Sequence, residues 1–413
     1  MIIIGHLHCD HIGLIPALFQ KGNANIKIII PKDSTCILKE MWYDTAYINE
    51  RDVESLNRKC EKLYEPLYTK NEVDIALKHI VEIDIGNMIE IDDNISIRYI
   101  PSGHILRACQ TELYININSH TKKILFTSDL GNKLIEDNKI FVEKFQPVTS
   151  ANICFGEATY GKRKGSMSKK DIALDRQKMK TVIQQFCIDN SHRVLIPTFS
   201  LDRMPFILWE LYQLFGDDTN FDIPILVDSP LANRLLDCYS YILKDEAKRK
   251  FDEMMAWKNI VRVISPEDSK AAIADKKTKI ICSSSGMLTA GRSVKWVQSI
   301  IPNENDCILF VGYAGEDTLA GHIKKGVTQK TININGKICK NKCQLIDLHS
   351  YSSHMQHNDL INYYKNINCE KIYLVHGDEQ ARKELKEDLE KELSNICKTT
   401  RVIIVNKGMK ISL

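Results

Sequence analysis

Residues 2–13 read IIIGHLHCDHIG, so an apolar run stops at Gly5 and is followed at once by three histidines and an aspartate. We expect a strand over residues 2–4, because β-branched residues favour strands. Alternate residues behind a strand project to the same side, so His6 and His8 can hold one metal ion while Asp10 and His11 face a second. Imidazole and carboxylate are ligands that suit zinc or manganese. The stretch therefore predicts a metal centre rather than a run of surface histidines.

The remainder of the chain alternates short β-branched runs with longer helical patterns, which is typical of an α/β protein. Strands are expected at residues 2–4, 26–30, 95–100, 124–127, 153–155, 194–196, 225–227, 280–282, 308–311, 372–375 and 402–405. Helical patterns cover residues 170–186, 204–215 and 380–393. At 413 residues the chain suits two domains, or one domain with a large insertion.

Composition excludes some classes of protein and leaves others open. The apolar fraction of 44% and the charged fraction of 26% are those of a globular protein. A net charge of +3 neither demands nor excludes a nucleic-acid partner. No apolar stretch is long enough to span a bilayer, so we expect a cytoplasmic protein with no membrane partner. The 13 cysteines lack paired spacing and are read as reduced core thiols.

Two further candidate ligands stand at the ends of expected strands. The stretch IPSGHILRACQ places His104 on a turn after residues 95–100, and ILFTSDLGN places Asp129 after residues 124–127. Taken alone, His104 fits a hydrogen-bonded loop histidine and Asp129 fits a helix cap. Both follow a strand as His6 does, however, and an aspartate there can bridge two cations with its two oxygens. We therefore expect His104 and Asp129 at the same metal centre.

Six motifs now carry a resemblance to a known family. HLHCDH, SGH and SDLG, in this order, resemble the second, third and fourth motifs of the metallo-β-lactamase fold hydrolases. FGEATYG (Phe155–Gly161), SYSSHMQ (Ser350–Gln356) and LVHGDE (Leu374–Glu379) resemble motifs A, B and C of the β-CASP nucleases. VLIPTFSLDR, PILVDSPLA and CSSSGMLTAGRS are similar to the inserted domain of bacterial and archaeal RNA-processing members, relatives of the endonuclease subunit of the cleavage and polyadenylation machinery. The resemblance runs through essentially the whole chain.

The resemblance implies a four-layered αββα metallo-β-lactamase domain, interrupted by an inserted α/β β-CASP domain. The expected boundaries are residues 1–159, 160–345 and 346–413. The implied function is zinc-dependent hydrolysis of RNA phosphodiester bonds, in RNA processing or decay. Two alternatives remain. A small-molecule metallo-hydrolase of this fold would need no insertion and no motif B histidine, and a non-catalytic RNA-binding scaffold would show broken ligand motifs.

The resemblance also implies a role for each site residue. Two zinc ions, with manganese as the alternative, would be held by two ligand sets: His6, His8, His104 and Asp129 for one ion, and Asp10, His11, Asp129 and His376 for the other. His354 would be the general acid that protonates the leaving 3′-oxygen, and Glu157 would orient it. Asp10 is counted both as a ligand and as a catalytic residue. Histidine at 376 points to RNA, because the RNA-directed branches of the family carry histidine there.

RNA-binding residues are harder to predict than the metal ligands. Ser284 and Ser285 stand at a strand-to-helix turn whose backbone N–H groups can cradle a phosphate. Arg203 either clamps a backbone phosphate or caps the sheet. The charged run of residues 162–170 reads better as a solvated loop, and Cys9 is given a packing role.

Family members normally carry a β-rich segment, including their first motif, before the strand that leads to His6. Here that strand opens the sequence. We expect a misassigned start or a fragment of a longer gene, in preference to a partner chain that supplies the strands. A homodimer is a further assembly that the sequence leaves open.

Overall fold

The computed structural model describes residues 1–20, 25–59, 63–118, 120–132, 140–165, 168–312, 314–315, 317–326 and 330–411. The chain forms two compact units, which are described separately below. Unit 1 comprises residues 1–167 and 353–413, and unit 2 comprises residues 168–352. The domain boundaries expected from the sequence, between residues 159 and 160 and between residues 345 and 346, stay predictions.

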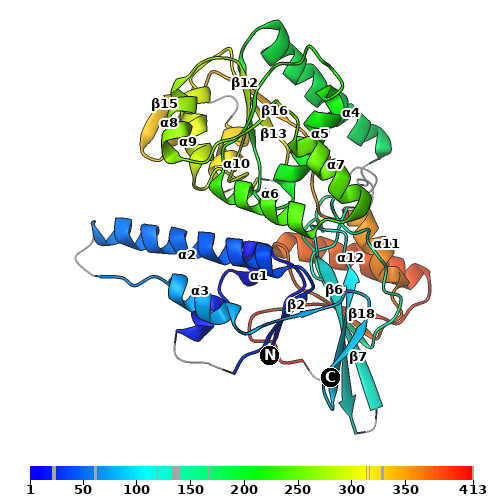
Figure 1. The fold of residues 1–413 in the computed structure, drawn as a ribbon. Helices are drawn as coiled ribbons and strands as arrows, with labels where there is room; N and C mark the ends of the chain where they lie inside the picture. Colours follow the sequence, from blue (N-terminus) through cyan, green and yellow to red (C-terminus); the bar gives the residue numbers. More distant parts are fainter. Residues whose placement is uncertain are drawn as a thin grey trace. The chain divides into compact units, whose positions relative to one another are not determined.

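Unit 1 contains two sheets (Figure 1). The smaller sheet has the parallel order β1-β2-β3, with β1 at Ile2–Ile3, β2 at Ile28–Pro31 and β3 at Ile80–Ile83. The larger sheet has the order β18-β17-β8-β7-β6-β5-β4. Its strands are β4 (Met88–Asp92), β5 (Ile95–Pro101), β6 (Cys109–Ile117), β7 (His120–Phe126), β8 (Ile153–Gly156), β17 (Lys371–Leu374) and β18 (Arg401–Ile404). Strands β4 to β7 are antiparallel, and β7, β8, β17 and β18 are parallel.

Helices enclose the two sheets of unit 1 and give it the αββα layering. Ile29 of the small sheet packs with Ile97 and Tyr99 of the large one, and the Tyr99 hydroxyl donates to the carbonyl oxygen of Ile29 at 3.0 Å. On the other face of the large sheet, Leu374 packs with Leu385 and other core residues of the last helices. The helices of this unit are α1 (Cys9–Ile12), α2 (Thr35–Asn57), α3 (Lys70–Leu77), α11 (His357–Asn366) and α12 (Glu379–Asn395), with a 3₁₀ turn at Pro16–Phe19.

Unit 2 is built on a six-stranded parallel sheet of order β11-β10-β12-β9-β13-β16. Its strands are β9 (Arg193–Pro197), β10 (Ile225–Val227), β11 (Ile260–Arg262), β12 (Lys279–Ser283), β13 (Cys307–Phe310) and β16 (Gln344–Asp347), with a separate hairpin of β14 (Thr331–Ile334) and β15 (Lys337–Lys340). Its helices are α4 (Lys169–Ile183), a π-helical turn (Gln184–Asp189), α5 (Arg203–Phe215), α6 (Pro230–Ile242), α7 (Asp245–Met255), α8 (Pro266–Ala274), α9 (Arg292–Ile300) and α10 (Leu319–Lys325). No helix in the described part of the chain is long and apolar enough to cross a lipid bilayer.

The strand directions in unit 1 decide where the polar motifs meet. Strands β5, β7, β8 and β17 all run the same way, since β5 and β7 are both antiparallel to β6. Their carboxyl ends therefore lie along one edge of the large sheet. His104, Asp129, Glu157 and His376 follow these four strands directly or within three residues. The fold thus gathers residues far apart in the sequence at one sheet edge.

Candidate metal centre

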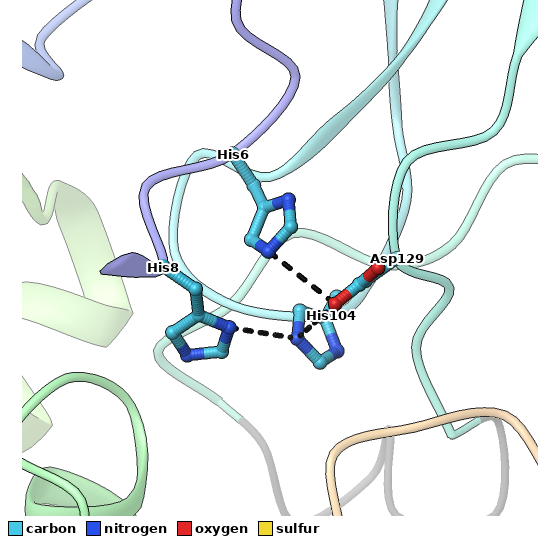
Figure 2. Close-up of side chains that lie close together, drawn as sticks. All are labelled: His6, His8, His104 and Asp129. Carbon is cyan, nitrogen blue, oxygen red and sulfur yellow. Dashed lines mark hydrogen bonds and ion pairs between the residues drawn. The ribbon is translucent and has the colours of Figure 1, made fainter. Parts of the chain in front are cut away.

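Three histidines and one aspartate form the first cluster at this edge. His6, His8, His104 and Asp129 each offer one ligand atom, and these atoms all lie within 4.8 Å of one another. The carboxylate oxygen Oδ2 of Asp129 lies 3.4 Å from Nε2 of His6 and 3.7 Å from Nε2 of His104. Nδ1 of His8 lies 3.2 Å from Nε2 of His104 (Figure 2). Four ligand atoms so close together match the number of ligands that a zinc ion usually takes.

A second cluster consists of Asp10, His11 and His376. Asp10 and His11 belong to the short helix α1. Oδ2 of Asp10 lies 3.1 Å from Nε2 of His376 and 3.5 Å from Nε2 of His11. The first and last parts of unit 1 in the sequence thus contribute to one cluster.

Asp129 faces both clusters. Its Oδ2 atom is turned to His6 and His104, while Oδ1 lies 3.6 Å from Nε2 of His11 and 3.6 Å from Nδ1 of His376. The side chain is only 2% exposed. A carboxylate with one oxygen in each cluster has the geometry of a bridging ligand between two cations.

Several buried polar atoms of these clusters form no hydrogen bonds with one another but are suited to bind metal ions. Within the described residues, Nε2 of His6, Nε2 of His11 and Oδ1 of Asp129 are buried without a hydrogen-bond partner. An unsatisfied buried polar atom costs about 1–3 kcal/mol. Here three such atoms lie close together. Bound cations would explain their burial, because each atom can donate a lone pair of the kind that zinc prefers.

Burial sets the protonation of the first cluster. Desolvation lowers the pKa of His6, lowers the pKa of His8 to about 3 and holds the pKa of His104 well below its ordinary value. All three imidazoles are therefore neutral at pH 7, which is the form that binds a metal.

The second cluster is protonated differently. Burial alone would lower the pKa of His11, but the carboxylates of Asp10 and Asp129 outweigh it and raise that pKa to about 10. Asp10 likewise raises the pKa of His376. For Asp129, burial acts to raise the pKa, but the neighbouring His11 and His6 lower it well below its ordinary value. Without a metal, the second cluster therefore holds protons where the first holds none.

Neighbouring hydroxyls orient two of the imidazoles, and the sequence alone did not reveal them. Nδ1 of His6 lies 2.8 Å from the Ser128 hydroxyl, and Nδ1 of His376 lies 2.9 Å from the Thr159 hydroxyl. Such contacts fix the ring and leave the other nitrogen free for a metal. Their positions in the sequence could have indicated these two hydroxyl residues, because Ser128 immediately precedes Asp129 and Thr159 follows Glu157 by two residues.

Gly131 brings two of the ligand loops into backbone contact. A Cβ atom at this position would lie 1.9 Å from the carbonyl oxygen of Gly103, so no larger residue fits. The Gly131 N–H donates to the carbonyl oxygen of Ser102 at 2.8 Å. The loops that carry His104 and Asp129 are thereby held together.

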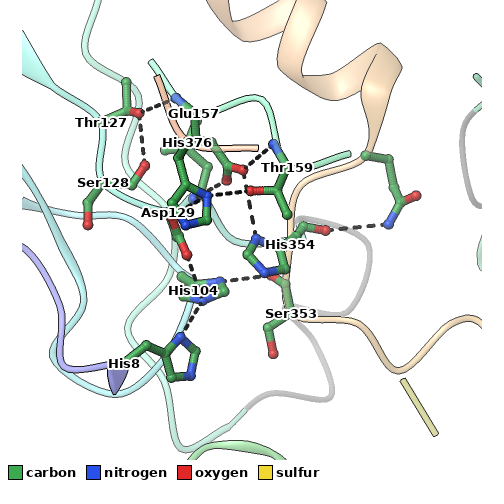
Figure 3. Close-up of polar contacts among 12 residues, drawn as sticks. His8, His104, Thr127, Ser128, Asp129, Glu157, Thr159, Ser353, His354 and His376 are labelled. Atoms are coloured by element: carbon green, nitrogen blue, oxygen red, sulfur yellow. Dashed lines mark hydrogen bonds and ion pairs between the residues drawn. The ribbon is translucent and has the colours of Figure 1, made fainter. Parts of the chain in front are cut away.

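His354 lies beside the clusters but belongs to neither (Figure 3). Its Nδ1 atom is 3.8 Å from Oε2 of Glu157, and its ring centroid is 4.6 Å from that of His104. Glu157 is 1% exposed and is held by the N–H groups of Leu130 at 2.6 Å and Thr159 at 3.2 Å. A fixed carboxylate thus faces a histidine that is still 21% exposed.

The three candidate RNA-binding residues all lie in unit 2, and their hydrogen bonds serve the fold. Arg203 is 7% exposed and donates to the carbonyl oxygen of Val311 at 2.6 Å, which is the contact that the sheet-capping alternative predicts. The Ser284 hydroxyl contacts the Ser229 hydroxyl at 2.5 Å, and Ser285 accepts from the Thr289 N–H at 2.9 Å. A role of these residues toward RNA stays a prediction.

Comparison with known proteins adds two domain matches and several relatives. Residues 206–323 match the Beta-Casp domain, and residues 340–402 match the Zn-dependent metallo-hydrolase RNA specificity domain. The transcription termination factor FttA of Methanocaldococcus jannaschii is 25% identical over 389 residues, which cover 92% of this chain and 58% of the relative.

Two further relatives have names that refer to RNA cleavage. The endoribonuclease YSH1 of Candida glabrata is 24% identical over 397 residues, covering 94% of this chain and 49% of the relative. An RNase J-like protein of M. jannaschii is 26% identical over 390 residues, covering 91% of this chain and 81% of the relative. The chain thus spans about half the length of YSH1 and 58% of FttA.

The layered unit 1, its two clusters and the parallel sheet of unit 2 define a metallo-hydrolase fold with an inserted domain. The chain contains a Beta-Casp domain and the RNA specificity domain of Zn-dependent metallo-hydrolases, and it resembles β-CASP proteins of the metallo-β-lactamase fold over more than nine-tenths of its length.

Proposed function

We propose that the chain is a zinc-dependent ribonuclease that hydrolyses RNA phosphodiester bonds with two metal ions, in RNA processing or decay. The observation that carries the proposal is the position of Asp129 between two ligand clusters, with the His354–Glu157 pair beside them. The Zn-dependent domain match and the endoribonuclease names among the relatives support it.

One ion would be held by His6, His8, His104 and Asp129, and the other by Asp10, His11, His376 and Asp129. When bound, such a pair of cations supplies charge stabilisation for the phosphoryl oxygens and activation of the attacking water. Histidine nitrogens and carboxylate oxygens fit zinc, with manganese as the weaker candidate.

His354 would donate a proton to the departing 3′-oxygen. An alkoxide leaving group needs a proton, and histidine is the side chain suited to supply it near neutral pH. Glu157 would hold the imidazole by the Nδ1 atom, 3.8 Å away, so that Nε2 carries the proton toward the substrate. The hydrogen bonds that fix Glu157 keep this direction constant.

A direct test is cleavage of RNA labelled at either the 5′ or the 3′ end by the purified protein. We expect cleavage that is abolished when a chelator removes the metal and restored when zinc is added back. A matched DNA oligonucleotide should be cleaved poorly. If zinc-loaded protein leaves RNA intact but binds it, the scaffold alternative is favoured instead.

Binding of the two metal ions should release different numbers of protons from the protein. The first cluster is already neutral at pH 7, since burial lowers the pKa of His6, His8 and His104. In the second cluster a cation must displace a proton from His11, whose pKa is raised to about 10. Between pH 7 and 9 we therefore expect the metal affinity of the first cluster to stay nearly constant, while that of the second cluster rises about tenfold per pH unit. Calorimetric titration of metal-free protein in buffers of different ionisation enthalpy measures both. Two pH-independent affinities would contradict this assignment.

A further inference from the structure

Helix α1 carries two candidate ligands of the second cluster, Asp10 and His11, and is only four residues long. A single turn of this length is not stable by itself in water, because ordering the first turn costs more free energy than its few hydrogen bonds supply. Burial of the two ligand side chains adds little, since Asp10 is exposed and His11 is only partly buried. The position of these ligands therefore depends on what holds α1 against the rest of unit 1.

A tryptophan of helix α2 holds the end of this turn. The indole Nε1–H of Trp42 donates to the carbonyl oxygen of Ile12 at 3.0 Å, and both side chains are buried. Among the described residues, this is the only hydrogen bond that joins the backbone of α1 to an element beyond residues 8–15. The Cys9 sulfur adds a weaker contact, at 3.7 Å from the Thr45 hydroxyl of α2. Helix α2, which lies beside α1 in Figure 1, is thus the support of the turn.

The first cluster is held by contacts that do not involve α2. His6 is buried, and its Nδ1 atom lies 2.8 Å from the Ser128 hydroxyl. The carbonyl oxygen of Gly5 accepts from the N–H of Cys109, at the start of β6, at 2.8 Å. Both contacts lie upstream of α1 in the sequence and tie the chain to the loops and strands of the large sheet. Loosening α1 should therefore displace the ligands of the second cluster more than those of the first.

We propose that Trp42 is a positioning residue that fixes α1 and thereby sets the metal affinity of the second cluster. This inference rests on the proposed function, because it concerns the second of the two metal ions. Trp42 belongs to neither cluster and acts through the carbonyl group of Ile12, the residue directly after His11. That carbonyl also accepts from the Ile15 N–H at 3.1 Å, so loss of the indole N–H leaves it bonded but frees the turn from α2. A site whose ligands are in place for only a fraction of the time binds more weakly by that fraction.

The test removes the indole N–H and measures zinc affinity by calorimetric titration of the metal-free protein. Trp42→Phe keeps a buried aromatic ring, and replacement of Trp42 by β-(3-benzothienyl)alanine keeps the bicyclic ring with sulfur in place of the N–H. Trp296→Phe is the matched control, because Trp296 is equally buried and its Nε1–H donates to Asp228 at 2.7 Å in unit 2. We expect both Trp42 variants to bind the second zinc ion about three- to tenfold more weakly. The first affinity, and both affinities of Trp296→Phe, should stay as in wild type.

Asp10→Ala identifies which affinity belongs to the second cluster, because it removes a ligand of that cluster alone. Adding the Trp42 replacement to Asp10→Ala should then leave the remaining affinity unchanged. Equal weakening of both sites, the same weakening in Trp296→Phe, or wild-type affinities in the Trp42 variants would each overturn the inference. If Trp42→Phe does not fold, the benzothienyl variant decides. If the wild-type protein binds fewer than two zinc ions, the proposed two-metal function is wrong and this inference falls with it.

Discussion

Replacement of Asp129 by alanine is expected to empty both metal sites at once. Its Oδ2 atom faces His6 and His104 and its Oδ1 atom faces His11 and His376, so one substitution removes a ligand from each cluster. Asp10 offers a ligand atom to the second cluster only, so it does not take the place of Asp129 in the first. We expect the purified variant to lose about two zinc ions per chain.

The measurement is elemental analysis after dialysis against a weak chelator. Glu112→Ala is the matched control, because Glu112 is also a buried carboxylate of unit 1, at 1% exposure, but pairs with Arg98 and Lys123 on the strands. It should lose stability and keep its zinc. Equal zinc in wild type and Asp129→Ala would exclude the bridging position. Loss of a single ion would assign Asp129 to one cluster alone.

Much of the fold and of the candidate site follows from local sequence. All eleven expected strands overlap strands of the structure, because short apolar runs rich in β-branched residues form strands in both units. The candidate ligands His104, Asp129 and His376 could be singled out for the same reason, since each follows the end of such a strand within three residues. The carboxyl ends of parallel strands meet at one edge, so strand ends far apart in sequence converge in space.

Strand β6 shows where that reasoning fails. Its buried residues include Gln110, Thr111 and Glu112, which read as polar surface in a hydrophobicity pattern. They are buried because they are paired. Gln110 donates to the carbonyl oxygen of Gln146, and Glu112 binds Arg98 and Lys123. Only tertiary structure supplies these partners, so the central antiparallel strand was not predicted.

The contacts that orient the site are hidden in the same way. Ser128 and Thr159 are likewise ordinary hydroxyl residues until the fold places His6 and His376 beside them.

Replacement of His354 by alanine is expected to slow RNA cleavage by ~10²–10⁴-fold, the usual contribution of a general acid. The imidazole is in neither ligand cluster, so the zinc content should stay as in wild type. The ring is partly exposed, at 21%, and its loss leaves Glu157 bonded to Leu130 and Thr159. RNA binding and the melting temperature should therefore change little.

The leaving group distinguishes proton donation from every other role of His354. A 3′-alkoxide leaves poorly without a proton, whereas a nitrophenolate leaves unaided. His354→Ala should therefore hydrolyse a nitrophenyl phosphodiester at close to the wild-type rate while remaining slow on RNA. Glu157→Gln should show the same pattern to a smaller extent, because an amide holds the imidazole but no longer stabilises its charged form. If the nitrophenyl ester is as slow as RNA while zinc is retained, His354 binds the phosphodiester rather than protonating the leaving oxygen, since a lost binding contact weakens both substrates alike.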